Sequence, residues 1–335
     1  MTHRIAVLKG DGIGREVVPW AVATLRALGP RWEFVEGEIG WDCFQRTGTA
    51  LPDETVTLLR TCEAALFGAV SSPSRKVPGY RSPIVALRRE FNLYANLRPV
   101  ASMPIPSSRR DVDMLIVREN TEGLYVQRER SDGETAVAER VITRTASERI
   151  GRLACQQAMR RRRHLTIVHK ANILPETCGL FRDAVRRVAA EYPGLTIEEV
   201  LVDTMALRLI RDPEHFDVVV TTNLFGDILS DEAAMLVGGL GLAPAGNIGD
   251  MLAIFEPVHG SAPDIVGRNI ANPLAAILSA AMLLEYLGET QEGDRVRAAV
   301  TATLQEGLLT PDLGGQATTA AVGEAVLRHL CRMQK

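Results

Sequence analysis

Short apolar segments that alternate with longer amphipathic ones constrain the fold of this chain most strongly. Segments typical of buried strands are Ile5–Leu8, Ala64–Phe67, Met114–Val117, Leu165–Val168, Glu198–Val202 and Val218–Thr221. Segments typical of helices are Glu16–Leu28, Glu148–Met159, Gly179–Glu191, Ala275–Leu287, Asp294–Glu306 and Thr318–Arg332. This alternation predicts an α/β fold with a largely parallel sheet. The length of 335 residues suggests two domains or one large one.

The composition argues against several classes of protein. A net charge of −3 is unlike that of proteins that bind nucleic acid through bulk charge. No apolar run reaches the roughly 18–20 residues of a membrane-spanning helix, and the N-terminus shows no signal-peptide cleavage site. The five cysteines are scattered without a C-x-x-C pair. We therefore expect a cytoplasmic protein with reduced thiols that binds neither nucleic acid nor a membrane.

The stretch Asp217–Asp231 runs from a buried strand into a helix that carries two aspartates four residues apart. Residues at this spacing are neighbours on a helix, with Cβ atoms roughly 5–6 Å apart. Asp227 and Asp231 should therefore project together beyond the carboxyl end of a strand, where open α/β sheets bind ligands. Asp203, at the end of the preceding strand, can add a third carboxylate. A divalent cation such as Mg²⁺ suits this set, and solvated acids are the alternative.

The glycines after the first predicted strand do not make a dinucleotide fingerprint. Gly10-Asp11-Gly12-Ile13-Gly14 has the spacing G-x-G-x-G, whereas the Rossmann pattern is G-x-G-x-x-G. We expect a tight turn from strand to helix, whose backbone can still lie beside a nucleotide.

Cationic side chains recur at the ends of predicted elements. Arg88, Arg98 and Arg118 can hold a di- or tricarboxylate through bidentate pairs, and each can equally be a surface ion pair. Lys170 follows a strand and can act as a general base if a neighbouring cation or desolvation lowers its pKa. An exposed charge is the alternative.

Two loops have features of binding segments. Residues 259–273 are punctuated by glycine and proline and can cradle an adenosine, and Asp264 would suit a ribose hydroxyl and repel a 2′-phosphate, which favours NAD over NADP. Residues 125–143 resemble a hairpin that turns at Asp132-Gly133. Such a hairpin can clasp a second subunit or be an ordinary surface feature.

Together these segments resemble the β-decarboxylating dehydrogenase family, which includes isocitrate, isopropylmalate, homoisocitrate and tartrate enzymes. The matching segments, in family order, are Gly10–Gly14, Leu93–Pro99, Arg118–Tyr125, His169–Asn172, Asn223–Asp231 and Glu256–Asp264. The resemblance implies an isopropylmalate dehydrogenase-like α/β fold, not a Rossmann fold, with two domains sharing a large mixed central sheet. Residues 1–98 with 252–335 would form the cofactor side. Residues 99–251 would hold the substrate, the metal and the subunit contact.

The resemblance also implies roles for the site residues. Mg²⁺ or Mn²⁺ would bind Asp227, Asp231 and the partner's Asp203, and the partner's Lys170 would accept the hydroxyl proton as hydride leaves C2 for NAD⁺. After CO₂ is lost, Tyr125 would take part in protonating the enol. The remaining substrate contacts would come from Arg88, Arg98, Arg118 and Asn172. The contacts to NAD would come from His259, Gly260, Ser261, Ala262, Asp264, Ile265 and Asn272. The implied assembly is a homodimer or tetramer with shared active sites.

The segment before Arg88 is expected to choose the 2-hydroxy acid. Ser72 and Ser82 are the expected polar contacts, while Ile84 stands where isocitrate enzymes tend to have asparagine. The segment looks most like that of homoisocitrate dehydrogenases, although some of these have arginine at the position of Val85. We predict NAD-dependent conversion of homoisocitrate to 2-oxoadipate, a step of lysine synthesis through α-aminoadipate. The alternative substrates are isopropylmalate and isocitrate, or the enzyme has dual specificity. A phosphoryl-transfer enzyme is an alternative of a different class, but it would need a P-loop, which the sequence lacks.

Overall fold

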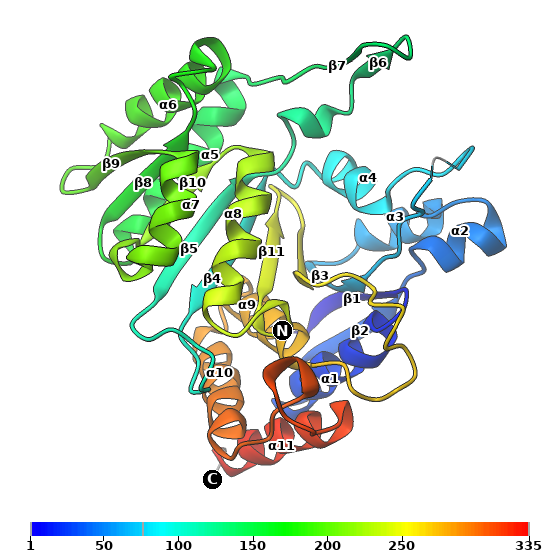
Figure 1. Cartoon of the computed structure of the whole chain (residues 1–335). Helices are drawn as coiled ribbons and strands as arrows, with labels where there is room; N and C mark the ends of the chain where they lie inside the picture. The colour runs from blue at the N-terminus through cyan, green and yellow to red at the C-terminus, as the bar shows by residue number, and fades with distance from the viewer. Residues whose placement is uncertain (1, 76, 334–335) are drawn as a thin grey trace. The chain divides into compact units, whose positions relative to one another are not determined.

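The structure is a computed structural model that describes residues 2–75 and 77–333 (Figure 1). The chain forms two compact units: unit 1 is Met1–Leu93, Met103–Ser108 and Val237–Lys335, and unit 2 is Tyr94–Ser102 and Arg109–Leu236. The predicted domains change over at residues 98/99 and 251/252, whereas residues 94–98 lie in unit 2 and residues 103–108 and 237–251 lie in unit 1. The functions assigned to the two domains stay predictions. Lys76, within the segment expected to choose the substrate, lies outside the described residues.

Unit 1 is built on strands of mixed direction in the order β2-β1-β3-β12-β11. These are β1 (His3–Gly10), β2 (Trp32–Glu36), β3 (Ala64–Ala69), β11 (Pro244–Ile248) and β12 (Ala253–Pro257). Strand β1 is parallel to β2 and β3, and β12 is parallel to β3 but antiparallel to β11. The central strand β3 is buried along its whole length, as expected for a strand that is covered on both faces.

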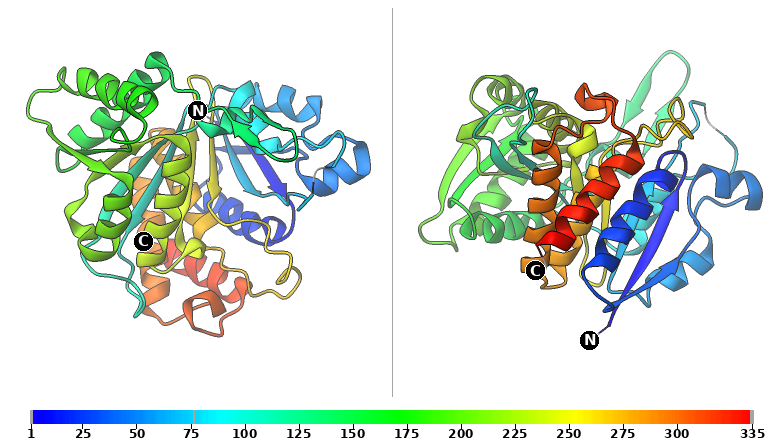
Figure 2. Two further views of the ribbon diagram at one scale, coloured as in Figure 1. Left: turned by 45° about the horizontal axis from the view of Figure 1, so that its top comes forward. Right: turned by 90° about the horizontal axis from the view of Figure 1, so that it is seen from below.

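Helices and short 3₁₀ turns complete unit 1. They are α1 (Gly14–Ala27), α2 (Trp41–Thr47), α3 (Asp53–Leu59), α4 (Pro83–Glu90), η3 (Leu240–Leu242), α9 (Leu274–Tyr286), α10 (Thr290–Gln305), η4 (Pro311–Leu313) and α11 (Thr319–Arg332). Helices α1, α9, α10 and α11 pack against one another (Figure 2). Helix α9 is buried from Leu274 to Leu284, because its side chains are apolar on all faces.

Unit 2 has its own strands in the order β4-β5-β10-β8-β9. These are β4 (Ala95–Ala101), β5 (Asp113–Glu119), β8 (His164–His169), β9 (Thr196–Leu201) and β10 (Val218–Thr221). Strands β5, β10, β8 and β9 are parallel, and β4 is antiparallel to β5. Because neighbouring parallel strands end at the same edge, the segments after β8, β9 and β10 all leave from one edge of these strands.

Two pairs of helices pack against the strands of unit 2. One pair is α5 (Arg144–Met159) and α6 (Pro175–Ala189), and the other is α7 (Val202–Arg211) and α8 (Asn223–Leu236), which lies in front of the strands in Figure 1. The 3₁₀ turns are η1 (Leu124–Val126) and η2 (Pro213–His215). Strands β6 (Glu129–Ser131) and β7 (Ala136–Ala138) form a separate, exposed antiparallel hairpin.

The expected α/β class is confirmed, and the strands run in mixed directions as the family resemblance implied. All of the strands expected from apolar runs are present. One boundary was wrong, because β9 ends at Leu201 and Val202 already begins α7. Asp203 therefore lies in the first turn of a helix and not at the end of a strand. No helix formed by residues 2–75 and 77–333 combines the length and hydrophobicity that crossing a membrane requires.

Candidate active site

The start of α8 gathers the charged side chains of unit 2. Asp227 and Asp231 lie one helical turn apart, as the sequence predicted. Asp227 accepts hydrogen bonds through Oδ1 from the guanidinium groups of Arg98 and Arg118, and through Oδ2 from the Tyr125 hydroxyl at 2.6 Å. Two aspartates, two arginines and one phenol thus lie together, although they come from two strands, one 3₁₀ turn and one helix.

Arg118 is the most deeply buried of these charges, with 1% of its surface exposed. Its Nε and Nη2 both donate to Oδ1 of Asn223, at 3.0 and 2.8 Å, and Nη1 pairs with Asp227. The guanidinium also lies 5.1 Å from the centre of the Tyr125 ring, within the range of a cation–π contact. A buried charge needs such partners, because an uncompensated one is strongly destabilising.

Gly226 makes room for Arg118. A Cβ atom added at Gly226 would lie 2.7 Å from both Cβ and Cγ of Arg118, closer than carbon atoms approach without moving. The glycine therefore brings the first turn of α8 against β5, where Arg118 is the sixth residue of the strand. The close packing of Gly226 against the Arg118 side chain limits where the guanidinium can lie.

Arg98 links both aspartates. Nη1 donates to Oδ1 of Asp231 at 2.7 Å and to Oγ of Ser230 at 2.7 Å, and Nη2 donates to Asp227 at 3.3 Å. Nε donates to Oδ1 of Asn96, two residues earlier on the same face of β4. Asn96 and Ser230 thereby hold the planar guanidinium in one orientation, which is what a bidentate carboxylate-binding group needs.

Asp231 is the more adaptable of the two carboxylates. Burial raises its pKa above the ordinary value and the Asp227 charge adds to this, while Arg98 and Arg118 oppose the rise. Its Oδ1 is bonded to Arg98, and no described residue donates to its Oδ2. With two carboxylates this close, the donor set is all oxygen, and it fits a hard divalent cation such as Mg²⁺ or Mn²⁺.

Lys170 and Asp203 form a second, separate pair in unit 2. Lys170 follows β8 and Asp203 lies in the first turn of α7, and Nζ is 2.5 Å from Oδ1 of Asp203. This hydrogen bond from Lys170 is the main reason that the pKa of Asp203 lies below its usual value. Within residues 2–75 and 77–333 of one chain, Asp203 does not converge with Asp227 and Asp231 on a common cation position. Asn172 is exposed in the loop after β8.

In unit 1, the glycine-containing turn between β1 and α1 packs against the predicted cofactor loop. The Ile13 N–H donates to the Ser261 carbonyl at 3.0 Å, and a Cβ added at Gly12, where φ is +54°, would lie 2.1 Å from that oxygen. The buried Asp11 carboxylate accepts hydrogen bonds from the backbone N–H groups of Trp41, Asp42 and Ser71. The chain thus turns tightly from β1 into α1, as expected, and the turn is also a close-packed junction with other segments, which the spacing did not predict.

The predicted cofactor loop presents a mixture of buried and exposed polar groups. Ser261 is buried and accepts a hydrogen bond from Ser71 Oγ at 2.8 Å, while Asp264 and Gly260 are exposed. Burial lowers the pKa of the His259 imidazole, so the ring is neutral near pH 7. Asn272 is buried against Asp312, and Ala262 has a φ of +41° where the chain turns toward Ile265. These groups can hold a nucleotide, with Asp264 available to a ribose.

The segment expected to choose the substrate also lies in unit 1. Ser82, Val85 and Arg88 follow one another at i, i+3 and i+6, so they lie along one side of α4 and the residue before it. Arg88 is buried and lines a small cavity with Asn247 and Glu256, whose side chains are joined by a hydrogen bond of 2.7 Å. Ser72 is exposed in the preceding loop.

Several residues that position the site had no predicted role. Asn223 bonds Arg118 twice, Asn96 and Ser230 orient Arg98, and Asp11 joins three backbone segments. All except Ser230 are fully buried polar side chains, and Ser230 is nearly so. The sequence could have indicated a role for Asn223. This polar residue comes soon after an apolar strand and four residues before Asp227, so the two side chains lie on the same face of the helix.

Comparisons with known proteins agree on one family. The family described as isocitrate/isopropylmalate dehydrogenase matches residues 4–326. An isocitrate/homoisocitrate dehydrogenase of Thermus thermophilus is 58% identical over 98% of this chain and 99% of that protein. A 3-isopropylmalate dehydrogenase of Methanothermobacter thermautotrophicus is 51% identical over 98% of each chain. The crystal structure of isocitrate dehydrogenase from Methylococcus capsulatus superposes with a TM-score of 0.93 at 42% identity, covering 98% of this chain and 99% of that one.

Proposed function

Because the chain belongs to the isocitrate/isopropylmalate dehydrogenase family, we propose that it oxidises and decarboxylates homoisocitrate to 2-oxoadipate with NAD⁺ and Mg²⁺ or Mn²⁺. The observation that carries this proposal is the cluster of Arg98, Arg118, Tyr125, Asp227 and Asp231. It combines carboxylate-binding groups with metal ligands, and members of the family are β-decarboxylating hydroxyacid dehydrogenases that use NAD(P) and a divalent metal. The reaction would serve lysine synthesis through α-aminoadipate.

Arg98 and Arg118 would bind the carboxylates of the substrate. Within the chain, Asp227 and Asp231 balance the charges of these guanidinium groups. When a substrate carboxylate takes over the guanidinium groups, the two aspartates are left with unbalanced negative charge and become better ligands for a cation. Substrate and metal should therefore bind cooperatively, and each should raise the affinity for the other by the same factor.

Asp227, Asp231 and the partner's Asp203 would hold the metal. When bound, Mg²⁺ supplies a Lewis acid beside the oxygen on which negative charge develops during oxidation and decarboxylation. The chain itself would contribute the proton transfers. Lys170 would accept the proton of the substrate hydroxyl at Nζ, and Tyr125, whose hydroxyl already donates to Asp227, would help return a proton to carbon after CO₂ leaves.

Unit 1 would bind the cofactor through residues 259–265 and Asn272. NAD⁺, when bound, supplies the hydride acceptor for C2 of the substrate. The exposed carboxylate of Asp264 supports NAD over NADP, because it can accept hydrogen bonds from a ribose diol and would repel a 2′-phosphate. Replacing Asp264 by asparagine should raise kcat/KM for NADP⁺ relative to NAD⁺, and an unchanged ratio would contradict this role.

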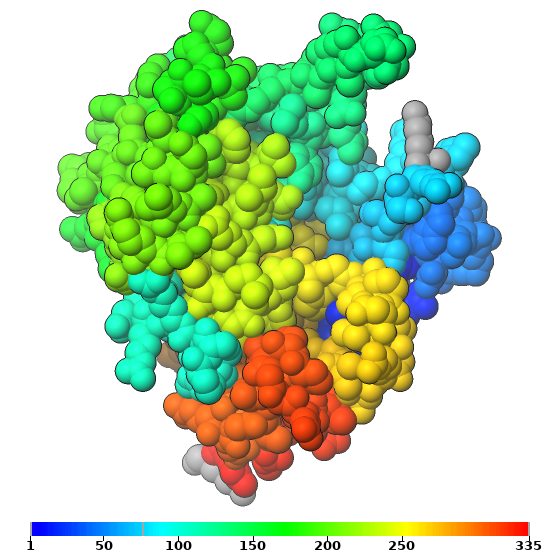
Figure 3. Space-filling model, viewed as in Figure 1, coloured from blue at the N-terminus to red at the C-terminus, as the bar shows by residue number. Residues whose placement is uncertain are grey.

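The surface of α7 and α8 supports an assembly with shared active sites. Leu207 and Ile210 on α7, and Ile228 and Met235 on α8, are 55%, 62%, 59% and 65% exposed. The two helices are packed side by side, and both lie on the face turned toward the viewer in Figure 3. Large apolar side chains gathered on neighbouring helices are typical of a surface that another protein covers.

The same helical faces carry the acidic residues. On α7, Asp203, Leu207 and Ile210 follow at i, i+4 and i+7, and on α8 Asp231 lies between Ile228 and Met235 at i+3. Pairing these faces about a twofold axis would bring α7 of one subunit toward α8 of the other. We therefore propose a homodimer, alone or within a tetramer, in which the partner's Asp203 and the partner's Lys170 complete each site.

Complementation tests the shared site. Asp203→Asn and Asp227→Asn chains should each be nearly inactive as homodimers. After co-refolding in equal amounts, about half of the dimers are mixed and each has one intact site, so about a quarter of the wild-type activity should return. If each site came from a single chain, no activity would return.

The substrate proposal is tested by comparing kcat/KM for homoisocitrate, isocitrate and 3-isopropylmalate with NAD⁺ and Mg²⁺. Homoisocitrate should be preferred, but one methylene is worth only about 1–3 kcal/mol of discrimination, so isocitrate should also react. A Val85→Arg variant should shift the preference toward substrates with a distal carboxylate. The main alternative substrate is 3-isopropylmalate, because the Methanothermobacter thermautotrophicus relative is a 3-isopropylmalate dehydrogenase. If the wild type clearly preferred 3-isopropylmalate, the proposed function would change to a step of leucine synthesis.

A cytoplasmic location is part of the proposal. The cysteines are all free thiols, and four of them are buried, at Cys43, Cys62, Cys155 and Cys178. Buried thiols without disulfide partners are typical of proteins that work in a reducing compartment, which supports this location.

A further inference from the structure

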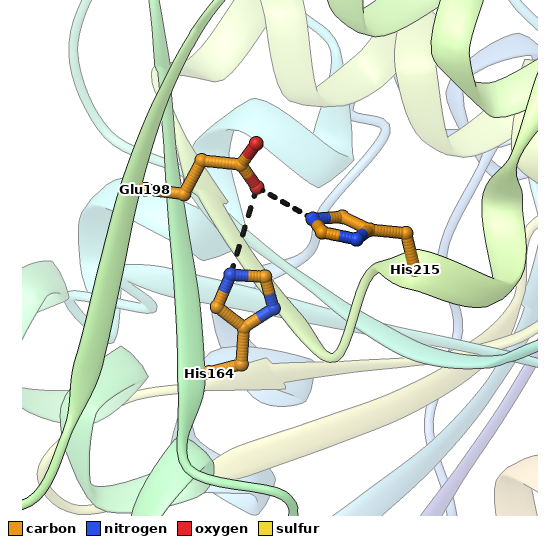
Figure 4. Close-up of side chains that lie close together, drawn as sticks. All are labelled: His164, Glu198 and His215. Atoms are coloured by element: carbon orange, nitrogen blue, oxygen red, sulfur yellow. Dashed lines mark hydrogen bonds and ion pairs between the residues drawn. The ribbon is translucent and has the colours of Figure 1, made fainter.

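A histidine–glutamate cluster in unit 2 lies away from the candidate active site. His164 is the first residue of β8, Glu198 is the third residue of β9, and His215 ends the 3₁₀ turn η2 before β10 (Figure 4). The Nε2 atoms of His164 and His215 lie 3.6 and 2.9 Å from the same oxygen, Oε2 of Glu198. One ligand atom from each of the three residues lies within 4.8 Å of the other two.

We propose that His164, Glu198 and His215 form a binding site for a borderline divalent cation such as Zn²⁺. Two imidazoles and one carboxylate, with a fourth position open to water, are an established zinc ligand set. With bonds of about 2.0–2.1 Å, the ligand atoms of a tetrahedral zinc site are roughly 3.3 Å apart. The two observed separations from Glu198, 3.6 and 2.9 Å, bracket that value, and the two histidine nitrogens lie within 4.8 Å of each other.

The hydrogen bonding of the cluster is incomplete without a cation. His215 is close enough to Glu198 for a hydrogen bond, but the 3.6 Å separation from His164 is too long for one. In the described part of the chain, no residue forms a hydrogen bond with the His164 ring, whose side chain is only 18% exposed. A cation among the three would engage both rings and the carboxylate at once.

The neighbouring charges orient Glu198 as a ligand. Arg208 donates from Nη1 to Oε1 of Glu198 at 2.5 Å, while Oε2 accepts from Thr166 Oγ1 at 3.4 Å and lies beside the two histidines. The Arg208 charge is shared with Asp212, to which it donates from Nε and Nη2 at 3.3 and 3.2 Å. A hydrogen bond to the outer oxygen of a ligating carboxylate is typical of metal sites, and the second carboxylate reduces the repulsion between Arg208 and a cation.

The site is distinct from the proposed catalytic metal site. His164 lies at the amino end of β8 and Lys170 follows its carboxyl end, so the two are roughly 20 Å apart along the strand. The nitrogen ligands also select a different cation, since Mg²⁺ prefers an all-oxygen set such as Asp227 with Asp231. The cation would tie β8, β9 and η2 together and would stabilise unit 2 without entering the reaction.

Isothermal titration of the full-length chain with Zn²⁺, in excess Mg²⁺, tests the proposal. An Asp227→Asn chain, in which the other carboxylate cluster is impaired, should still bind one Zn²⁺. Adding His215→Gln should weaken that binding by at least about tenfold, because one of three protein ligands is lost. His329→Gln is the matched control, because His329 on α11 pairs with Glu306, the residue that follows α10, without a second histidine. It should leave Zn²⁺ binding unchanged.

A thermal-unfolding measurement provides a second readout. In the Asp227→Asn background and in excess Mg²⁺, Zn²⁺ should raise the unfolding temperature of the parent chain and of its His329→Gln derivative, but not of its His215→Gln derivative. The midpoint of His215→Gln without metal shows that the variant is folded, which is expected because His215 is 42% exposed. The proposal is overturned if His215→Gln binds Zn²⁺ like its parent, or if Asp227→Asn alone abolishes binding.

Discussion

Replacing Gly226 by alanine tests whether the close approach of α8 to β5 sets the position of Arg118. The new Cβ would lie 2.7 Å from Cβ and Cγ of Arg118, so either the helix or the arginine must move. Alanine is favoured over glycine by about 1 kcal/mol within a helix, whereas overpacking a tight interior costs about 1–3 kcal/mol. The free energy of unfolding should therefore change little or fall by up to about 2 kcal/mol.

The effect on activity should be larger than the effect on stability. Arg118 is proposed to bind a substrate carboxylate and is held by Asn223 and Asp227 on either side. A displacement of about 1 Å in a positioning group can cost on the order of 100-fold in rate. We expect kcat/KM to fall about 10- to 100-fold in Gly226→Ala while most of the protein stays folded.

The assay combines urea unfolding with steady-state kinetics followed by NADH absorbance. Gly179→Ala in α6 is the matched control, because a Cβ at Gly179 would meet no atom within 4 Å. That variant should gain about 0.5–1 kcal/mol of stability and keep its activity. If Gly226→Ala were as active as Gly179→Ala, the close contact would not determine the position of Arg118 and the reasoning would be refuted.

Further predictions concern a buried thiol, the subunit contact and the turn after β1. Burial raises the pKa of the Cys155 thiol from its ordinary value of 9.0 to about 11, so between these pH values the folded state keeps a proton that the unfolded state loses. The contribution of the protonated Cys155 thiol to the free energy of unfolding is complete below pH 9 and is lost as the pH rises toward 11. The loss is at most about 1.4 kcal/mol per pH unit. In urea unfolding measured at several alkaline pH values, Cys155→Ala should show a smaller fall of stability with pH. Ile210→Glu should dissociate the proposed dimer in analytical ultracentrifugation and lower activity, whereas Met251→Glu, at an exposed position of unit 1, should do neither. Gly12→Ala should lower the unfolding temperature, because its Cβ would overlap the Ser261 carbonyl, and unchanged stability would show that the turn can relax.

Much of the fold follows from local sequence. Apolar runs such as Val218–Thr221 located the buried strands, since a strand covered on both faces must be apolar throughout. Strands β2, β4, β11 and β12 were not among the predicted ones. For example, β4 contains Arg98 and Pro99, and β11 is Pro-Ala-Gly-Asn-Ile. Their place in the sheet depends on pairing with distant strands, which has no local signal.

In the candidate site too, some features followed from local sequence, whereas others depended on contacts between distant residues. The spacing of Asp227 and Asp231 predicted their proximity, because one turn of helix brings them together. The contacts of Arg98 with both aspartates span more than 120 residues of sequence, so they depend on how β4 lies relative to α8. Asp203 shows the limit of local reasoning, because the continuing apolar character of Leu201 and Val202 concealed the change from strand to helix.

By itself, the sequence determined the α/β class, most of the strands, the aspartate pair and the resemblance to a dehydrogenase family, because these depend on periodicity and on short motifs. The tertiary structure decided which charges compensate one another: Arg118 with Asn223 and Asp227, Arg98 with Asp231, and Lys170 with Asp203. It also brought His164, Glu198 and His215 together from three elements. Electrostatic pairing falls off over a few ångströms, and only the folded chain brings residues that are far apart in sequence within that range.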